Sequence, residues 1–228
     1  MSRTSCPGWR ASFASTAEMM FDDRRHAGKV VAKMVVEAQP QDPVVLALPR
    51  GGVPVGYEVS QALRCPLDVL VVKKVGVPGQ PELAMGAVGE HNVTIVHQPV
   101  LAAAGVGATT LDSAIERSRT ELDDAVSRYR PEKEPEEVKA RTVIIVDDGL
   151  ATGSTARAAV EVVGTRGAAA VWLAVPVAPA STMREMSGLV DKLLVAHRPR
   201  RFIAVGNWYR DFRQTTDSEV IAMLRDRR

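Results

Sequence analysis

The segment TVIIVDDGLATGST, residues 142–155, determines how the rest of the sequence is interpreted. Its apolar run Val143–Val146 is short and continuous, which is typical of a buried strand in a parallel sheet. Two adjacent carboxylates, Asp147 and Asp148, follow directly, and a short loop then leads into a helical pattern from Ala156. Neighbouring strand side chains point to opposite faces, so burying both aspartates would carry a large desolvation cost. We therefore expect them at an open strand end.

The loop after the aspartates has the composition of an anion-binding site. Residues 152–155, Thr-Gly-Ser-Thr, supply hydroxyls, small side chains and backbone N–H groups at a helix N-terminus. The carboxylates can accept hydrogen bonds from ligand hydroxyls or hold a hard divalent cation through water. Each piece also has an ordinary structural explanation, since Asp148 can begin a turn and Ser154 can cap a helix. The order of the pieces favours a site for a phosphorylated sugar.

The whole segment resembles the phosphoribosyl-pyrophosphate (PRPP) binding motif of the type I phosphoribosyltransferases: four apolar residues, two acids and a Thr/Gly/Ser loop. The resemblance implies that the loop holds the 5-phosphate and that the aspartates hold the ribose hydroxyls. It also implies Mg²⁺, near Asp147 and Asp148, bridging the donor's oxygens and held largely by substrate and water. A P-loop is excluded because no lysine precedes the helix. The PRPP-binding residues implied in this segment are Asp147, Asp148, Gly149, Ala151, Thr152, Gly153, Ser154 and Thr155.

Composition sets the broad class of the protein. The chain has 228 residues, 46% hydrophobic and 25% charged, which is ordinary for a globular domain. A net charge of +2 gives no bulk argument for nucleic-acid binding. Cys6 and Cys65 lie far apart and imply neither a disulfide framework nor a metal site. No apolar segment is long enough to span a bilayer, and we expect a cytoplasmic protein with no membrane partner.

Strand-like and helix-like segments alternate along the chain, which predicts an α/β fold with a mainly parallel twisted sheet and helices on both faces. We expect residues 1–20 to form a flexible N-terminal arm and residues 21–228 to form a single domain. The family resemblance adds a small hood built from the N- and/or C-terminal segments. The predicted strands are Val44–Leu48, Leu67–Val72, Val143–Val146, Ala170–Ala178 and Leu189–His197; a further short strand, Val93–Val96, suggests a hairpin. The predicted helices are Phe21–Val36, Val53–Leu63, Thr110–Tyr129, Ala156–Arg166 and Ser181–Ser187.

The first predicted strand ends in Pro49-Arg50-Gly51-Gly52. Paired glycines let the backbone approach an anion closely while the arginine faces it. The segment resembles the pyrophosphate loop of the same family, in which a non-proline cis peptide is often found, and the Pro49–Arg50 bond is the candidate. A simple turn with a solvated arginine is the ordinary alternative.

Lys73 and Lys74 follow the second predicted strand and precede the Gly/Pro-rich segment VGVPGQPELAMG. Two cations at that place suggest a mobile loop that closes over negative charge, and the segment resembles the family's flexible catalytic loop. Spacing does not say which lysine reaches the ligand, and both can simply be solvated. Glu82 on this segment is a candidate general acid-base residue. The catalytic candidates are therefore Arg50, Lys73, Lys74 and Glu82.

The C-terminal segment concentrates three aromatics, Trp208, Tyr209 and Phe212. In the family, a hood outside the central sheet stacks on the acceptor base, and an aromatic ring offers it a π face. The same rings could instead pin the C-terminal helix to the sheet. Sequence alone favours neither explanation.

The resemblance implies a Mg-dependent transferase that moves the 5-phosphoribosyl group of PRPP to a small-molecule acceptor, a nitrogenous base or similar amine, with release of pyrophosphate. Nucleotide salvage is the corresponding role, and a homodimer is left open. Ala151 stands where the hypoxanthine-guanine branch carries an aspartate, so the loop is nearer the adenine branch. Two alternatives remain: a regulator that senses PRPP or a nucleotide without turnover, and a transferase for a non-nucleobase acceptor. Retention of Arg50 and both lysines favours chemistry.

Overall fold

The computed structural model describes residues 20–130 and 134–226, apart from the side chains of residues 81 and 82. The predicted flexible segment 1–20 lies outside this range except for Met20, and so does Cys6. Cys65 is a free thiol, and burial raises its pKa to about 11. None of the helices in the described part of the chain is long and apolar enough to cross a membrane.

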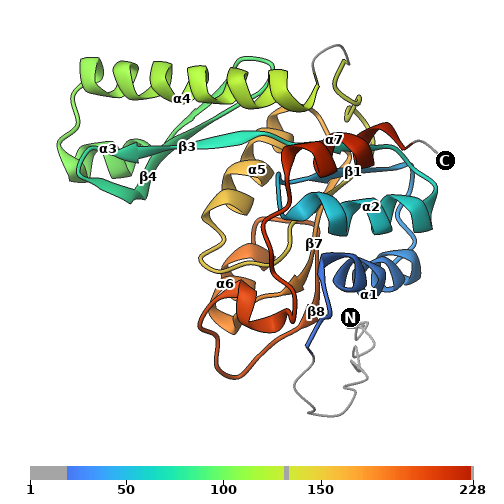
Figure 1. Cartoon of the computed structure of the whole chain (residues 1–228). Helices are drawn as coiled ribbons and strands as arrows, with labels where there is room; N and C mark the ends of the chain where they lie inside the picture. The colour runs from blue at the N-terminus through green and yellow to red at the C-terminus, as the bar shows by residue number, and fades with distance from the viewer. Residues whose placement is uncertain (1–19, 131–133, 227–228) are drawn as a thin grey trace, which may run out of the picture.

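Within the described residues, the body of the protein is built on a five-stranded parallel sheet in the order β2-β1-β6-β7-β8 (Figure 1). Every neighbouring pair is parallel, as the continuous apolar runs predict. Ala47 lies opposite Val146, so β1 and β6 end side by side. The predicted fold class is confirmed. The strands are β1 (Pro43–Ala47), β2 (Leu67–Val69), β6 (Thr142–Val146), β7 (Ala170–Val177) and β8 (Lys192–His197).

Helices cover both faces of this sheet because alternate residues of the central strand face opposite layers. Ile144 and Val146 belong to the core beneath α1 and α2, and Val143 and Ile145 belong to the core beneath α5. All four are fully buried, and each such side chain stabilises the fold by about 1.5–3 kcal/mol. The helices of the body are α1 (Arg24–Glu37), α2 (Gly52–Leu63), α5 (Ser154–Thr165) and α6 (Ala180–Ser187).

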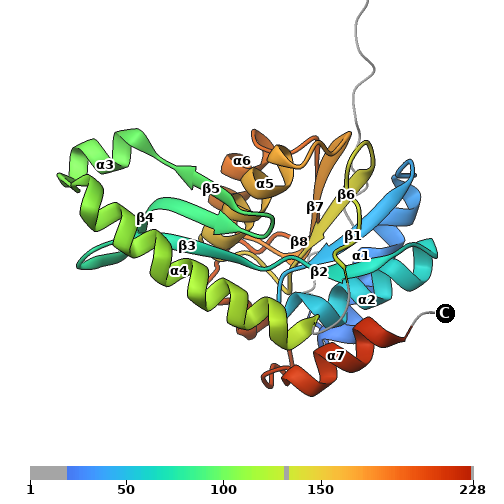
Figure 2. The ribbon, with the colours of Figure 1, turned by 90° about the horizontal axis from the view of Figure 1, so that it is seen from above.

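A second sheet, which the sequence did not predict as such, forms a lateral module, defined here as residues 72–129. Its three strands pair antiparallel in the order β3-β4-β5. Figure 1 shows the module projecting from one side of the body, and Figure 2 shows α4 running across β3 and β4. The elements are β3 (Val72–Val77), β4 (Gln80–Gly89), β5 (Val93–Val96), α3 (Gln98–Ala104) and α4 (Ala108–Tyr129).

Two predictions about this region are wrong. The expected strand Leu67–Val72 is divided, because β2 ends at Val69 in the parallel sheet and β3 begins at Val72 in the other sheet. The Gly/Pro-rich segment is a hairpin rather than a loop, so Lys73 and Lys74 lie within β3 and not after a strand end. The hairpin turns at Gly79, whose φ of 78° is the left-handed conformation that glycine adopts freely. Buried apolar side chains on β3, β4 and α4 give the hairpin a core of its own: Val75, Val77, Met85, Val88 and Ala114.

A buried ionic cluster joins the module to the body. Arg130, directly after α4, lies 3.4 Å from the carboxylate of Asp68 on β2 and forms an ion pair with Glu90 after β4. All three side chains are almost fully buried. Backbone N–H groups satisfy the carboxylates further, since Val69 donates to Asp68 and Val71 donates to Glu90. The cluster therefore fixes the base of the module to the edge of the parallel sheet.

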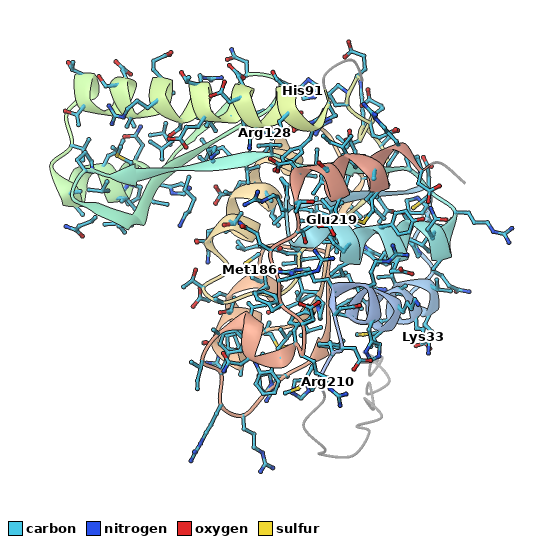
Figure 3. All side chains as sticks on the ribbon, viewed as in Figure 1. Lys33, His91, Arg128, Met186, Arg210 and Glu219 are labelled. Carbon is cyan, nitrogen blue, oxygen red and sulfur yellow. The ribbon has the colours of Figure 1, made fainter. Side chains whose placement is uncertain are left out.

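The C-terminal segment returns to the N-terminal helix. Phe21 pairs with Tyr209 in an isolated parallel bridge, and the two rings lie 5.5 Å apart. After the short helix η1 (Val205–Trp208), α7 (Asp217–Arg225) begins with a capping box between Thr216 and Glu219. Figure 3 shows Glu219 at α7 and Arg128 at the nearby end of α4.

Candidate functional site

The acidic pair and the glycine pair lie against each other at the carboxyl ends of β6 and β1. A Cβ added to Gly51 would lie 2.0 Å from Asp148 Oδ2, and one added to Gly52 would lie 2.6 Å from the carbonyl oxygen of Val146. No larger residue fits at either position without displacing the other segment. Both aspartates are half-buried rather than enclosed in the core. The two segments, about a hundred positions apart in sequence, thus form one corner of the sheet edge where parallel α/β proteins bind ligands.

The Pro49–Arg50 peptide bond in this corner is cis, as the family resemblance predicted. The Nη1 of Arg50 lies 3.5 Å from Asp217 Oδ1 at the start of α7. Tyr129 also donates a hydrogen bond to that carboxylate, at 3.0 Å. In this structure Arg50 is therefore partnered by α7 rather than directed at Asp147 or Asp148.

Asp148 is held from three sides. Arg24 at the start of α1 donates from Nε to Asp148 Oδ2 at 2.8 Å. The hydroxyl of Tyr209 donates to the carbonyl oxygen of Asp148, and the backbone N–H of Asp148 donates to Asp147 Oδ1 at 2.8 Å. Arg24 was not foreseen, because nothing local marks a contact between residues 124 positions apart.

The two carboxylates are electrostatically destabilised. Desolvation and the adjacent Asp148 raise the pKa of Asp147 well above its usual range. Desolvation also raises the pKa of Asp148, and the Arg24 guanidinium opposes that rise. Tyr209 lies beside them, and desolvation and the carboxylates raise the pKa of its hydroxyl as well. Carboxylates in such a setting gain from a ligand that supplies hydrogen-bond donors or positive charge.

The loop after the aspartates leads directly into α5. Gly153 has a φ of 73°, and α5 starts at Ser154, two residues before the predicted position. Thr182 of α6 donates a hydrogen bond from its hydroxyl to the carbonyl oxygen of Ala151 at 2.6 Å, which connects the loop to α6. The hydroxyls of Thr152 and Ser154 are 3.2 Å apart, and Thr155 is exposed. The hydroxyls and the helix N-terminus thus lie together at an accessible edge.

The two lysines of β3 face different elements because neighbouring strand residues point to opposite faces. Lys74 Nζ donates to Ser154 Oγ at 3.2 Å, whereas Lys73 Nζ forms an exposed ion pair with Glu121 of α4 at 3.1 Å. A pocket of about 190 Å³ opens between β4 and α5, lined by Lys74, Thr152, Ser154 and Arg157 among others. The structure thus brings Lys74, and not Lys73, to the loop. Glu82 lies in β4, but its side chain is outside what the structure describes.

Further ionisable side chains line this pocket and were not predicted. His97 Nε2 lies 3.1 Å from the carboxylate of Glu161, and Arg157 Nη2 lies 3.3 Å from that of Glu185. The i, i+4 spacing of Arg157 and Glu161 on one helix was readable from the sequence. That the β4–β5 hairpin would cover this face of α5 was not.

The three aromatics have different surroundings. Tyr209 is 5% exposed and packs on Phe21, so it lies inside the joint between the N-terminal and C-terminal segments. Trp208 packs against His197, with the ring centres 4.9 Å apart. Phe212 is 37% exposed, and the guanidinium of Arg24 lies 3.9 Å from its ring centre. These rings stay predicted acceptor contacts, with Phe212 the most accessible.

The residues present fit a loosely held hard cation rather than a fully caged one. Among the described residues, no three His, Cys, Asp or Glu side chains gather as a metal-binding group. Asp147 and Asp148 offer oxygen atoms of the kind that Mg²⁺ prefers, but Arg24 already occupies one oxygen of Asp148. Any magnesium here would depend mainly on oxygens of the ligand and of water.

The family model described as "Phosphoribosyl transferase domain" matches residues 20–197. A Mycobacterium tuberculosis protein of strain H37Rv, named "Putative phosphoribosyl transferase Rv0571c", is 43% identical over 205 residues, which is 90% of this chain and 46% of the relative. The chain therefore spans about half the length of that curated relative. The crystal structure of TT1426 from Thermus thermophilus is similar with a TM-score of 0.84 and 40% identity, covering 90% of this chain and 98% of that one.

Proposed function

Because the chain belongs to the phosphoribosyl transferase domain family, we propose that it transfers the 5-phosphoribosyl group of PRPP to a nitrogenous base or similar amine acceptor. In this reaction the bond between ribose C1 and the pyrophosphate oxygen breaks, and a bond between C1 and the acceptor nitrogen forms. Pyrophosphate leaves with the electron pair of the broken bond. A cytoplasmic role in nucleotide salvage is the corresponding cellular setting.

One observation carries the proposal: Asp148, Gly51 and Gly52 form a single corner, with the hydroxyl loop beside it. Residues 152–155 would receive the 5-phosphate at the N-terminus of α5, and Lys74 beside Ser154 would add positive charge. Asp147 and Asp148 would accept hydrogen bonds from the ribose hydroxyls. The raised pKa values of both aspartates support this role, because hydrogen bonds from sugar hydroxyls would stabilise carboxylates that have lost their hydration.

The leaving group would lie at the corner formed by Gly51 and Gly52, where the backbone admits a close approach. Arg50 would face it only after its side chain turns from Asp217, to which it is bound in this structure. Asp147 and Asp148, together with oxygens of the ligand and of water, would hold Mg²⁺, which would neutralise charge on the pyrophosphate. Phe212, the most exposed of the three rings, would contact an acceptor with the part of its surface that Arg24 leaves open, and Glu82 remains the proposed acid-base residue.

Calorimetric titration of PRPP in the presence of Mg²⁺ tests the proposal. We expect the wild-type protein to bind and the double variant Asp147→Asn/Asp148→Asn to lose binding. The matched control is Asp123→Asn/Asp124→Asn, which changes an adjacent exposed pair on α4 and should bind as the wild type does. Unchanged binding in the first variant would refute the assignment.

Turnover is a separate measurement. Incubation with PRPP, Mg²⁺ and a panel of nitrogenous bases should release pyrophosphate with one acceptor or one class of acceptors. Binding of PRPP with no release across the panel would instead favour a PRPP-sensing protein, the alternative that the sequence left open.

A further inference from the structure

We propose that Arg24 is a positioning residue of the donor site, which fixes the Asp148 carboxylate so that its remaining oxygen faces the ribose hydroxyls of the ligand. This inference rests on the proposed function, because it names a further residue of the same site. The residue lies on α1, far from the motif in sequence, and its neighbour Arg25 points elsewhere.

Arg24 is held in one orientation by three interactions. Its Nε donates to Asp148 Oδ2 at 2.8 Å, and its Nη1 donates to the carbonyl oxygen of Arg213 at 2.6 Å. The guanidinium stacks on Phe212, with its central carbon 3.9 Å from the ring centre. The side chain is only 11% exposed. An arginine held by two hydrogen bonds and a stacked ring loses little further conformational freedom when a ligand binds.

The two oxygens of the Asp148 carboxylate have different surroundings. Oδ2 points at Arg24 and lies where a Cβ on Gly51 would stand, so both the partner and the backbone fix this oxygen. The hydrogen bond and the ion pair from Arg24 both fall on Oδ2, and the side chain keeps 15% of its surface exposed. A carboxylate accepts several hydrogen bonds, so Oδ1 is left for a ligand while Oδ2 sets its direction.

The competing explanation is purely structural: the ion pair would only tie α1 to the end of β6. A tie of that kind should affect the stability of the whole site and all ligands alike. A positioning role should affect only ligands that carry ribose hydroxyls. Ribose 5-phosphate and inorganic phosphate differ by the sugar alone. Comparing the affinities of these two ligands therefore separates the two explanations.

The experiment measures dissociation constants of ribose 5-phosphate and inorganic phosphate for the wild type, Arg24→Gln, Arg24→Lys and the control Arg25→Gln. Arg25 is 50% exposed on the same helix and pairs with Glu58, so it controls for loss of a cation from α1. We expect Arg24→Gln to weaken ribose 5-phosphate about tenfold, as for a hydrogen bond to a charged group, and to leave phosphate within about twofold. Arg24→Lys keeps the charge without the rigid fork and should lie between Arg24→Gln and the wild type.

Two results would overturn the inference. One is ribose 5-phosphate affinity in Arg24→Gln equal to that in Arg25→Gln. The other is an equal loss for phosphate and ribose 5-phosphate, which indicates a general structural effect; thermal unfolding of each variant identifies it. Both leave the proposed function standing if the wild type binds PRPP. A wild type that does not bind PRPP overturns the proposed function and this inference together.

Discussion

The parallel sheet and the lateral module both place candidate site residues around the loop of residues 152–155, and they do so in different ways. The sheet delivers Asp147, Asp148 and Gly51 by backbone register, because neighbouring parallel strands end at one edge. The module delivers Lys74 from the middle of a strand, and a buried ionic cluster fixes the base of that module. Placement by register depends on apolar packing, whereas the module combines apolar contacts to the body with a few buried charges at its base. The two regions should therefore respond to different substitutions.

The buried cluster at the base of the module should give the largest effect. Arg130→Met leaves the carboxylates of Asp68 and Glu90 buried without their cation, which typically costs about 3–5 kcal/mol. Arg128→Met, close in sequence but half-exposed and 3.6 Å from its partner Asp217, should cost less than about 1 kcal/mol. Chemical denaturation measures both free energies of unfolding. Similar values for the two variants would show that the cluster does not hold the module.

Substitution of the two lysines compares the faces of the module. Lys74→Gln should weaken PRPP binding about tenfold or more, since a charge-assisted contact to the phosphate that we propose at residues 152–155 would be worth about 1.5–3 kcal/mol. Lys73→Gln removes only an exposed ion pair with Glu121 and should leave the affinity within about twofold. Titration with PRPP distinguishes them, and a larger loss for Lys73→Gln would mean that the module presents its other face to the donor.

Alanine substitution of one glycine in the body and one in the module compares how tightly side chains pack around each position. Gly153, directly before α5, and Gly79 in the hairpin turn both have positive φ, so alanine strains each backbone by a similar amount. A Cβ on Gly153 would also lie 2.8 Å from Thr182 Cγ2, whereas Gly79 has open space around it. We expect Gly153→Ala to be the more destabilising by about 1–2 kcal/mol in thermal unfolding. Equal losses of stability for the two variants would mean that α6 shifts easily to accommodate the added methyl group.

The smallest effect concerns pH and the acidic pair. The raised pKa of Asp147 means that the folded state holds this proton more tightly than the unfolded chain, whose aspartates titrate near pH 4. Stability contributed by the protonated form is therefore present below about pH 4 and is lost as pH rises through the folded-state pKa. Asp147→Asn, which can still accept the hydrogen bond from the Asp148 N–H, should raise the free energy of unfolding at pH 7 by about 1 kcal/mol.

The pH dependence supplies the control for that prediction. At about pH 4 and below, Asp147→Asn and the wild type should unfold with nearly the same free energy, since both carry a neutral group at this position. A variant that is less stable than the wild type at pH 7 would show that the carboxylate contributes to folding rather than opposing it.

The same contrast explains what could be predicted from the sequence. The strands of the body are continuous apolar runs, such as Val143–Val146, and β1 and β6 lead into the glycines and aspartates that the sequence had marked as site candidates. The module's strands contain Gly, Pro and Lys, so their pattern indicated a loop although antiparallel pairing accommodates them. That Lys73 and Lys74 point to opposite faces of the module could be inferred only once β3 was known to be a strand. Arg24 left no signal, because its partner Asp148 is distant in sequence and neither residue lies in a shared pattern.

The most direct test of the central claim is a crystal structure of the protein with PRPP and Mg²⁺. We expect the 5-phosphate at residues 152–155, within hydrogen-bonding distance of Lys74 Nζ, and the ribose hydroxyls on Asp147 and on Asp148 Oδ1. A ligand whose phosphate lies away from this loop, with the Arg24–Asp148 pair and the Gly51 corner empty of ribose, would contradict it.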